Sequence, residues 1–154
     1  MIHPRLRNLE LEDPDSLFAE IRKADLLLHH PYHYYETSIL RFLESAVRDP
    51  KVLALKLTIY RTSSRSPIIQ ILKEAAMAGK QVVMLVEITA RFDEAPNIAL
   101  GEELEKVGVH VVYGVKRLKT HVKLGLVIRE EEDGLRRYVH LSTCLLYTSP
   151  SPRT

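Results

Sequence analysis

Short apolar runs alternate with amphipathic stretches through the middle of the chain. The apolar runs are rich in β-branched residues and predict buried strands at 52–60, 81–88 and 109–113. A helix is expected after the first run, because Ser66 and Pro67 suit its N-cap and first position and Gly79 suits its end. A second helix, capped by Asp93, is predicted to run to about Val107. This β-α-β-α-β order predicts a parallel sheet with right-handed crossovers.

The region before the first strand has helical spacing of its apolar residues. It predicts one helix over 15–28, capped by Asp15 or Ser16, and a second over 36–47. Residues 1–14 are polar and contain prolines, so we expect a linker that comes from an upstream region.

The last third of the chain alternates between polar and apolar residues. The runs 121–129 and 138–141, with the polar segment 130–134 between them, predict an antiparallel hairpin added to the sheet. Alternate residues of a strand share a face. We expect a core face made by Thr120, Val122, Leu124, Leu126 and Ile128. We expect an exposed face made by Lys119, His121, Lys123 and Gly125.

The composition is that of one globular domain. Of 154 residues, 45% are hydrophobic and 27% charged, and no apolar run approaches the length of about 18 residues that spans a bilayer. No signal peptide is visible, and the single cysteine, Cys144, excludes a disulfide framework. These features predict a cytoplasmic protein, with peripheral attachment to a membrane left open. The net charge of +2 does not indicate a polyanionic partner.

The segment 116–129 changes that picture, because it holds five lysines and arginines and no acid. His121 lies between Lys119 and Lys123, and a glycine in a strand often marks the close approach of a ligand, here at Gly125. A neutral imidazole is a good nucleophile near pH 7, and lysines can hold phosphate oxygens. The pattern therefore favours attack on phosphorus. The alternative is a solvated basic strand face.

Two arginines follow the first two predicted strands. Arg61 comes directly after the first and Arg91 shortly after the second, so both are expected at the same sheet edge, where ligands bind. Arginine suits bidentate phosphate contacts, although loop arginines are also commonly just solvated.

Other histidines are weaker candidates. His29, His30 and His33 could suggest a metal cluster, but no cysteine is nearby and Pro31 interrupts the spacing, so we favour a structural or interface role. His140, in the last predicted strand, is a candidate at the edge of the phosphate site.

Five separate blocks of the chain resemble polyphosphate kinase, the long-chain, histidine-phosphorylating family. The blocks are HHPYHYYE (29–36), VLALKLTIYRTSSRSPII (52–69), AAMAGKQVVMLVEITARFDEAPNIAL (75–100), VGVHVVYGVKRLKTHVKLGLVIR (107–129) and RRYVHLST (136–143). The resemblance implies a phospholipase D-like α/β fold, with residues 15–143 forming the first of two such halves, cut short at its end. It also implies a homo-oligomeric full-length enzyme that acts on ATP or ADP and polyphosphate and not on nucleic acid.

The resemblance assigns roles to individual residues. His121 matches the histidine that takes the terminal phosphate of ATP and passes it reversibly to polyphosphate. Lys123 should stabilise the transferring phosphoryl group, and Lys119 is a possible phosphate contact. Arg61 and Arg91 match arginines that the family places at a magnesium-phosphate site. An arginine has no lone pair for Mg²⁺, so we expect both to hold phosphate oxygens beside the ion, and no carboxylate ligand is identified.

The chain departs from related patterns in two places. Phospholipase D enzymes need an acid at the position of Ile128, which argues against the alternative of a phosphodiesterase. A second alternative is a non-catalytic, polyanion-binding module. The match stops at Cys144, and CLLYTSPSPR resembles the translation of a sequencing-library adapter, so 144–154 is expected to be non-native rather than a genuine flexible terminus. As one half of a site, the fragment is expected to be inactive alone.

Overall fold

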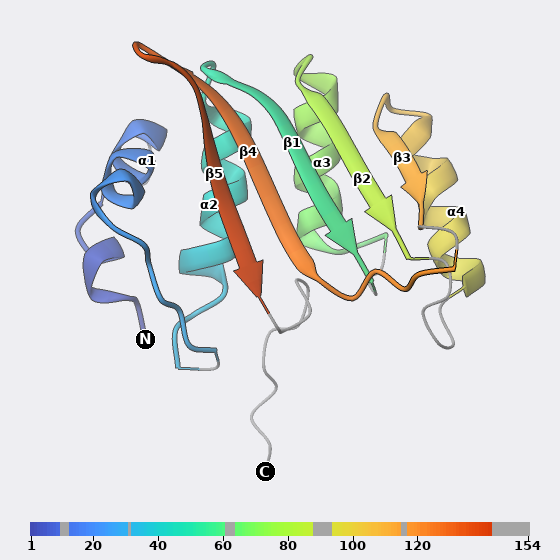
Figure 1. The fold of residues 1–154 in the computed structure, drawn as a ribbon, viewed down its shortest axis with the longest axis horizontal. Helices are drawn as coiled ribbons and strands as arrows, with labels where there is room; N and C mark the ends of the chain where they lie inside the picture. The colour runs from blue at the N-terminus through green and yellow to red at the C-terminus, as the bar shows by residue number, and fades with distance from the viewer. Residues whose placement is uncertain (10–12, 31, 61–63, 88–93, 115–116, 143–154) are drawn as a thin grey trace.

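A mixed five-stranded sheet with helices on one of its faces forms the body of the molecule (Figure 1). The computed structural model describes residues 1–9, 13–30, 32–60, 64–87, 94–114 and 117–142. The helical elements are η1 (Pro4–Leu6), α1 (Pro14–Lys23), η2 (Glu36–Leu40), α2 (Arg41–Arg48), α3 (Pro67–Met77) and α4 (Glu94–Glu105). The strands are β1 (Val52–Ile59), β2 (Gln81–Val86), β3 (His110–Tyr113), β4 (Lys123–Glu131) and β5 (Gly134–Ser142).

The sheet has the strand order β3-β2-β1-β4-β5. The pairs β1–β2 and β2–β3 are parallel, whereas β4 runs antiparallel to both β1 and β5. The predicted α/β architecture, a parallel β-α-β-α-β unit with an added antiparallel hairpin, is therefore confirmed. The parallel strands all end at one edge of the sheet, and β4 begins at that same edge.

The helix ends follow local chemistry, and α1 departs from the prediction at both of its ends. Its cap is Asp13, whose carboxylate accepts a hydrogen bond from the Asp15 amide (3.0 Å), rather than Asp15 or Ser16. Helix α3 begins at Ser66-Pro67 as expected, and Gly79 follows its end with a φ of +84°, a conformation that glycine adopts without strain. Helix α1 stops at Lys23, short of the predicted residue 28. The Arg5 guanidinium donates hydrogen bonds to the carbonyls of Ala24 (3.1 Å) and Asp25 (3.0 Å) just beyond it. These bonds stabilise the non-helical backbone there.

The first residues, for which a linker was predicted, are attached to the domain. Leu6 is only 2% exposed and lies in the main hydrophobic core. The buried side chain of Arg41 donates hydrogen bonds to the carbonyls of Leu6 (3.1 Å) and Leu9 (3.0 Å). Residues 1–9 are thereby held at the start of α2.

The prediction of which face of β4 enters the core is wrong. Lys123, Gly125, Val127 and Arg129 face the helices and are buried, whereas the leucines between them lie on the opposite face and are only partly buried. The described helices cover only one face, and on that side Val127 joins the core and Arg129 finds acidic partners. Residues 119–122 precede β4 and form no strand.

The face of the sheet away from the helices is largely apolar and exposed within the described residues, with Lys56 and Arg137 as exposed charged side chains on it. Its most exposed large side chains include Leu53 (43%), Leu135 (61%), Val139 (51%) and Leu141 (66%). Within the ranges that the structure describes, no helix is both long and apolar enough to cross a membrane.

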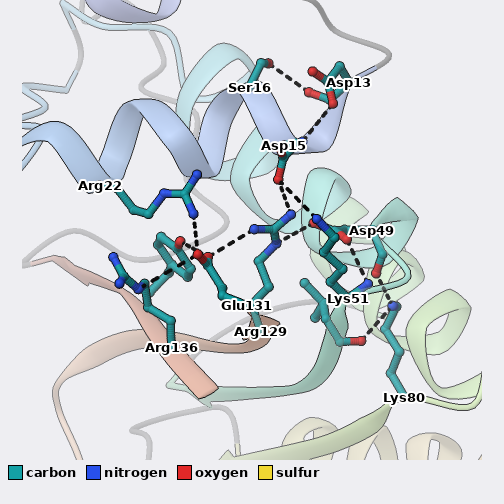
Figure 2. Close-up of polar contacts among 12 residues, drawn as sticks. Asp13, Asp15, Ser16, Arg22, Asp49, Lys51, Lys80, Arg129, Glu131 and Arg136 are labelled. Carbon is teal, nitrogen blue, oxygen red and sulfur yellow. Dashed lines mark hydrogen bonds and ion pairs between the residues drawn. The ribbon is translucent and has the colours of Figure 1, made fainter. Parts of the chain in front are cut away.

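A buried cluster of charges holds the other end of the sheet together (Figure 2). The Arg129 side chain is 2% exposed and donates hydrogen bonds to Asp49 (2.7 Å), Glu131 (3.0 Å) and Asp15. Its guanidinium also lies 5.1 Å from the centre of the Phe18 ring. Burial disfavours the charged guanidinium, but the hydrogen bonds to the three carboxylates outweigh this and raise the pKa of Arg129.

Glu131 extends this cluster to helix α1 and strand β5. Its carboxylate accepts hydrogen bonds from Arg22 and from the hydroxyl of Tyr138. Burial opposes its charge, but the hydrogen bonds from Tyr138, Arg129 and Arg22 hold the pKa of Glu131 down at about 2. The cluster therefore joins α1, the turn before β1 and the hairpin through ion pairs that favour the charged forms of Arg129 and Glu131.

The variant Arg129→Met is expected to destabilise the fold by about 3 kcal/mol, because it leaves Asp49 buried without its counter-charge. Urea unfolding followed by circular dichroism measures the loss. Arg137→Met, which removes an exposed arginine from the neighbouring strand, is the control and should change stability by less than about 0.5 kcal/mol. Equal midpoints for the two variants would show that the buried cluster contributes nothing to stability.

Candidate active site

The residues predicted to carry chemistry gather around the ring of Tyr60, just beyond the end of β1. The His121 and Tyr60 rings meet edge to face with centroids 5.0 Å apart. The Nζ atoms of Lys119 and Lys123 lie 5.6 Å and 4.9 Å from the centre of the same ring. The structure therefore brings the exposed His121 ring and the two lysine ammonium groups to the same tyrosine ring.

Lys123 is the buried member of this group. Its side chain lies against the helix side of the sheet, the residue is 3% exposed, and its ammonium donates a hydrogen bond to the carbonyl of His121. Burial lowers the pKa of Lys123, and the electrostatic effect of Tyr60 opposes that shift in part. Lys119 is exposed, so the two lysines offer different environments to an anion.

The segment that carries His121 crosses the sheet edge beneath the ends of β1 and β2 (Figure 1). Arg117, near its start, has a φ of +67° and is the only non-glycine with positive φ among the described residues. The carboxylate of Glu87 accepts a hydrogen bond from the backbone of Thr120 (2.6 Å). The hydroxyl of Thr58 donates to the carbonyl of Val122 (2.6 Å) and accepts from the amide of Leu124 (2.9 Å).

Asn97, from α4, fastens the ends of the parallel strands to each other. It is fully buried, and its Nδ2 donates to the carbonyls of Tyr60 (3.0 Å) and Glu87 (2.9 Å). Its Oδ1 is buried and has no hydrogen-bond partner among the residues that the structure describes. A buried carbonyl oxygen without a donor is available to a cation or to a ligand.

Sequence reasoning missed four residues of this site, which are Thr58, Tyr60, Glu87 and Asn97. Two of them could have been noticed in the sequence. Tyr60 and Glu87 each carry a polar group and directly follow a mostly apolar strand. Arg61 and Arg91 lie outside the described residues, so their meeting at this edge stays a prediction. The structure brings their described neighbours Tyr60 and Glu87 to that edge, where the Glu87 amide donates to the Ile59 carbonyl (3.0 Å).

His140 lies beside Gly125, the position at which the sequence predicted the approach of a ligand. It pairs across the hairpin with Gly125, and a Cβ added to that glycine would meet the Cβ of His140 at 3.8 Å, an ordinary contact. His140, His30 and Val122 line one pocket between β5 and the segment after α1. The expectation that Gly125 admits a ligand therefore gains no support, since its missing side chain faces His140.

The basic segment does not form one continuous patch. Lys123 is buried at the active-site end of β4, and Arg129 is paired with carboxylates at the other end. Only Arg117 and Lys119 are exposed among its described basic residues. The expected polyanion-binding strip over 116–129 is therefore wrong for its C-terminal part. There the basic side chains are buried on the helix side of the sheet and are not exposed to a polyanion.

The N-terminal histidines make backbone and ring contacts. His33 Nδ1 accepts a hydrogen bond from the His29 amide (2.8 Å), and His30 packs edge to face on Tyr35 with centroids 6.2 Å apart. No group of three or more histidine, cysteine or acidic side chains suited to a metal occurs in the part of the chain that the structure describes.

Comparison with known proteins connects this geometry with one family. A family model described as polyphosphate kinase C-terminal domain 1 matches residues 16–151. The polyphosphate kinases of Mycobacterium leprae and Mycobacterium tuberculosis H37Rv are 58% and 57% identical over 134 residues, which is 87% of the chain. The chain spans 18% of the length of these relatives.

The fold has a counterpart among solved structures. The crystal structure of polyphosphate kinase from Porphyromonas gingivalis superposes with a TM-score of 0.73 at 36% sequence identity. The match covers 88% of this chain and 22% of that one. The likeness extends to sequence and fold alike.

The burial of His140 predicts an acid-sensitive fold. Burial, with a smaller effect of His30, lowers the pKa of His140 from 6.5 to about 4. The unfolded chain therefore binds this proton near pH 6.5 and the folded chain only near pH 4, so stability falls as the pH drops through that interval.

We expect His140→Gln to remove about 1 to 3 kcal/mol of this pH dependence. The measurement is the free energy of urea unfolding between pH 7 and pH 4. The control His110→Gln removes an exposed histidine from β3 and should leave the curve of the parent chain unchanged. Parallel curves for His140→Gln and the parent would contradict the burial of a neutral imidazole.

Proposed function

The chain belongs to the polyphosphate kinase family, and from that premise we propose that it is part of an ATP:polyphosphate phosphotransferase. The reaction transfers the terminal phosphate of ATP to polyphosphate, reversibly, through a phosphohistidine at His121. The observation that carries this proposal is the exposed His121 imidazole beside Tyr60, with Lys119 and Lys123 against the same ring. The proposed location is the cytoplasm.

The chemistry needs a nucleophile and positive charge at one place. In the first step, a lone pair of the His121 imidazole forms a bond to the terminal phosphorus while the bond to the bridging oxygen breaks, and ADP leaves with that electron pair. In the second step, a terminal oxygen of polyphosphate attacks the same phosphorus and the imidazole leaves. Lys119 and Lys123 stabilise the charge on the transferring group. Arg61 and Arg91 are proposed to hold phosphate oxygens.

The donor set at the sheet edge fits a magnesium ion that travels with the phosphates. Mg²⁺ prefers oxygen ligands and usually takes one or two carboxylates together with substrate phosphates. Glu87 supplies a carboxylate and Asn97 an unpartnered Oδ1 at this edge, and these are the described side chains that would hold the ion. When bound, the ion would neutralise phosphate charge.

Neither alternative activity gains an observation in its favour. A phosphodiesterase of the phospholipase D type needs an acid where Ile128 stands, and Ile128 lies mid-strand between Ala54 and Arg137. A non-catalytic polyanion-binding module needs an exposed basic strip, whereas Lys123 and Arg129 are buried.

In a full-length enzyme that carries these residues, His121→Ala is expected to abolish the phosphoenzyme, because His121 is the described imidazole that packs on Tyr60, the ring that both lysines approach. The measurement is acid-labile ³²P retained on the protein after incubation with γ-labelled ATP. Arg61→Ala and Arg91→Ala should slow the labelling without unfolding the domain. Retained labelling in the His121→Ala protein would falsify the assignment.

The 154 residues alone are expected to make no polyphosphate, because the proposed reaction needs a nucleotide site that the family completes with a second half. The assay is ATP-dependent polyphosphate synthesis by the purified fragment, with full-length M. tuberculosis polyphosphate kinase as the positive control. Synthesis by the fragment would show that one half is enough.

A further inference from the structure

The backbone on both sides of His121 lies outside the strand pairing of the sheet. The register between β1 and β4 ends at the pair Leu57–Gly125, Lys123 and Leu124 pair only with β5, and residues 119–122 form no strand. A segment without ladder hydrogen bonds would be expected to vary in position. A nucleophile, in contrast, must stand within a fraction of an ångström of its reacting geometry.

Thr58 takes the place of the missing pairing on the C-terminal side of His121. Its hydroxyl donates to the Val122 carbonyl at 2.6 Å and accepts from the Leu124 amide at 2.9 Å. One side chain thus satisfies a carbonyl and an amide that a neighbouring strand would otherwise pair. Threonine is β-branched, so its χ1 angle has few alternatives and the hydroxyl is held in place.

Glu87 bonds to the backbone on the N-terminal side of His121. Its carboxylate accepts the Thr120 amide at 2.6 Å, and the residue is only 1% exposed. The backbone of Glu87 is fixed in turn, because its amide bonds to Ile59 and its carbonyl accepts from Asn97. The two side chains therefore fasten the peptides before and after His121 to the rigid ends of β1 and β2.

We propose that Thr58 and Glu87 are positioning residues, which hold the backbone of residues 120–124 so that the His121 imidazole stands against Tyr60 and at the lysines. This inference rests on the proposed phosphohistidine function. Thr58 acts only through the position of His121, whereas the carboxylate of Glu87 is also one of the groups proposed to hold the magnesium ion. Loss of the hydrogen bonds that Thr58 makes to this backbone should slow phosphoryl transfer to the histidine while leaving the binding of ATP nearly unchanged.

The test uses a full-length chimera, in which residues 14–142 replace the matching stretch of M. tuberculosis polyphosphate kinase. Thr58→Val keeps the shape of the side chain and removes the hydroxyl, whereas Thr58→Ser keeps the hydroxyl. Thr37→Val is the matched control, since that hydroxyl also donates to a backbone carbonyl, at Tyr34 (3.3 Å), but far along the chain from His121. The readouts are the single-turnover rate of ³²P-phosphohistidine formation, the KM for ATP and the melting temperature.

We expect Thr58→Val to lower the phosphorylation rate by about 10- to 100-fold with a KM for ATP within about threefold of the parent. Thr58→Ser should restore the rate to within about threefold, and Thr37→Val should match the parent. A rate for Thr58→Val equal to that of the parent overturns the inference. So does a Thr58→Ser protein that is as slow as Thr58→Val.

A second variant covers the case in which Thr58→Val does not fold. Thr58→Ala removes the hydroxyl and adds no bulk, and a labelling rate lowered by about 10-fold or more at an unchanged melting temperature is expected. An unchanged rate in Thr58→Ala, together with an unfolded Thr58→Val, overturns the inference. A parent chimera that takes up no acid-labile label overturns the proposed function itself, whereas a labelled parent with equally fast variants overturns only the positioning roles.

Discussion

The buried guanidinium of Arg129 is the contact on which the arrangement of the other elements depends. It joins helix α1 through Asp15, the turn before β1 through Asp49, and the hairpin through Glu131. A charge that is almost out of contact with water is tolerated only where its partners surround it, so these three parts come together as one unit. The hairpin thereby takes one register against β1, and that register decides where β4 begins and where His121 leaves the sheet.

Much of the fold could be predicted because it depends on local patterns. The apolar runs that became β1 and β2 and the Ser-Pro start of α3 carry their own signals in sequence. The face of β4 could not be predicted in the same way. Its leucines look like a core face and its charged residues like a solvent face, but Arg129 is buried by a partner at Asp49, 80 residues away in sequence. The ion pair with Asp49, rather than the polarity of Arg129, therefore decides which face of β4 is buried.

In the candidate site, too, residues close together in sequence could be predicted, whereas those brought together by the fold could not. His121 and the lysines on each side of it stand out in sequence because they are close together in the chain. Thr58 and Glu87 do not stand out, because an ordinary threonine and an acid at a strand end gain meaning only when the register brings them against the peptides of residues 120–124. Gly125 was expected to admit a ligand, but in the structure it is buried and faces the Cβ of His140 across the hairpin.

His121 and Arg129 stand at opposite ends of one stretch of chain. The eight residues from one to the other span up to about 26 Å at the usual rise of a strand. The charges of the cluster are paired with one another, so over that distance the cluster exerts only a weak field on the imidazole. Its influence on the site is therefore mechanical, because it sets the register from which the backbone of His121 takes its place.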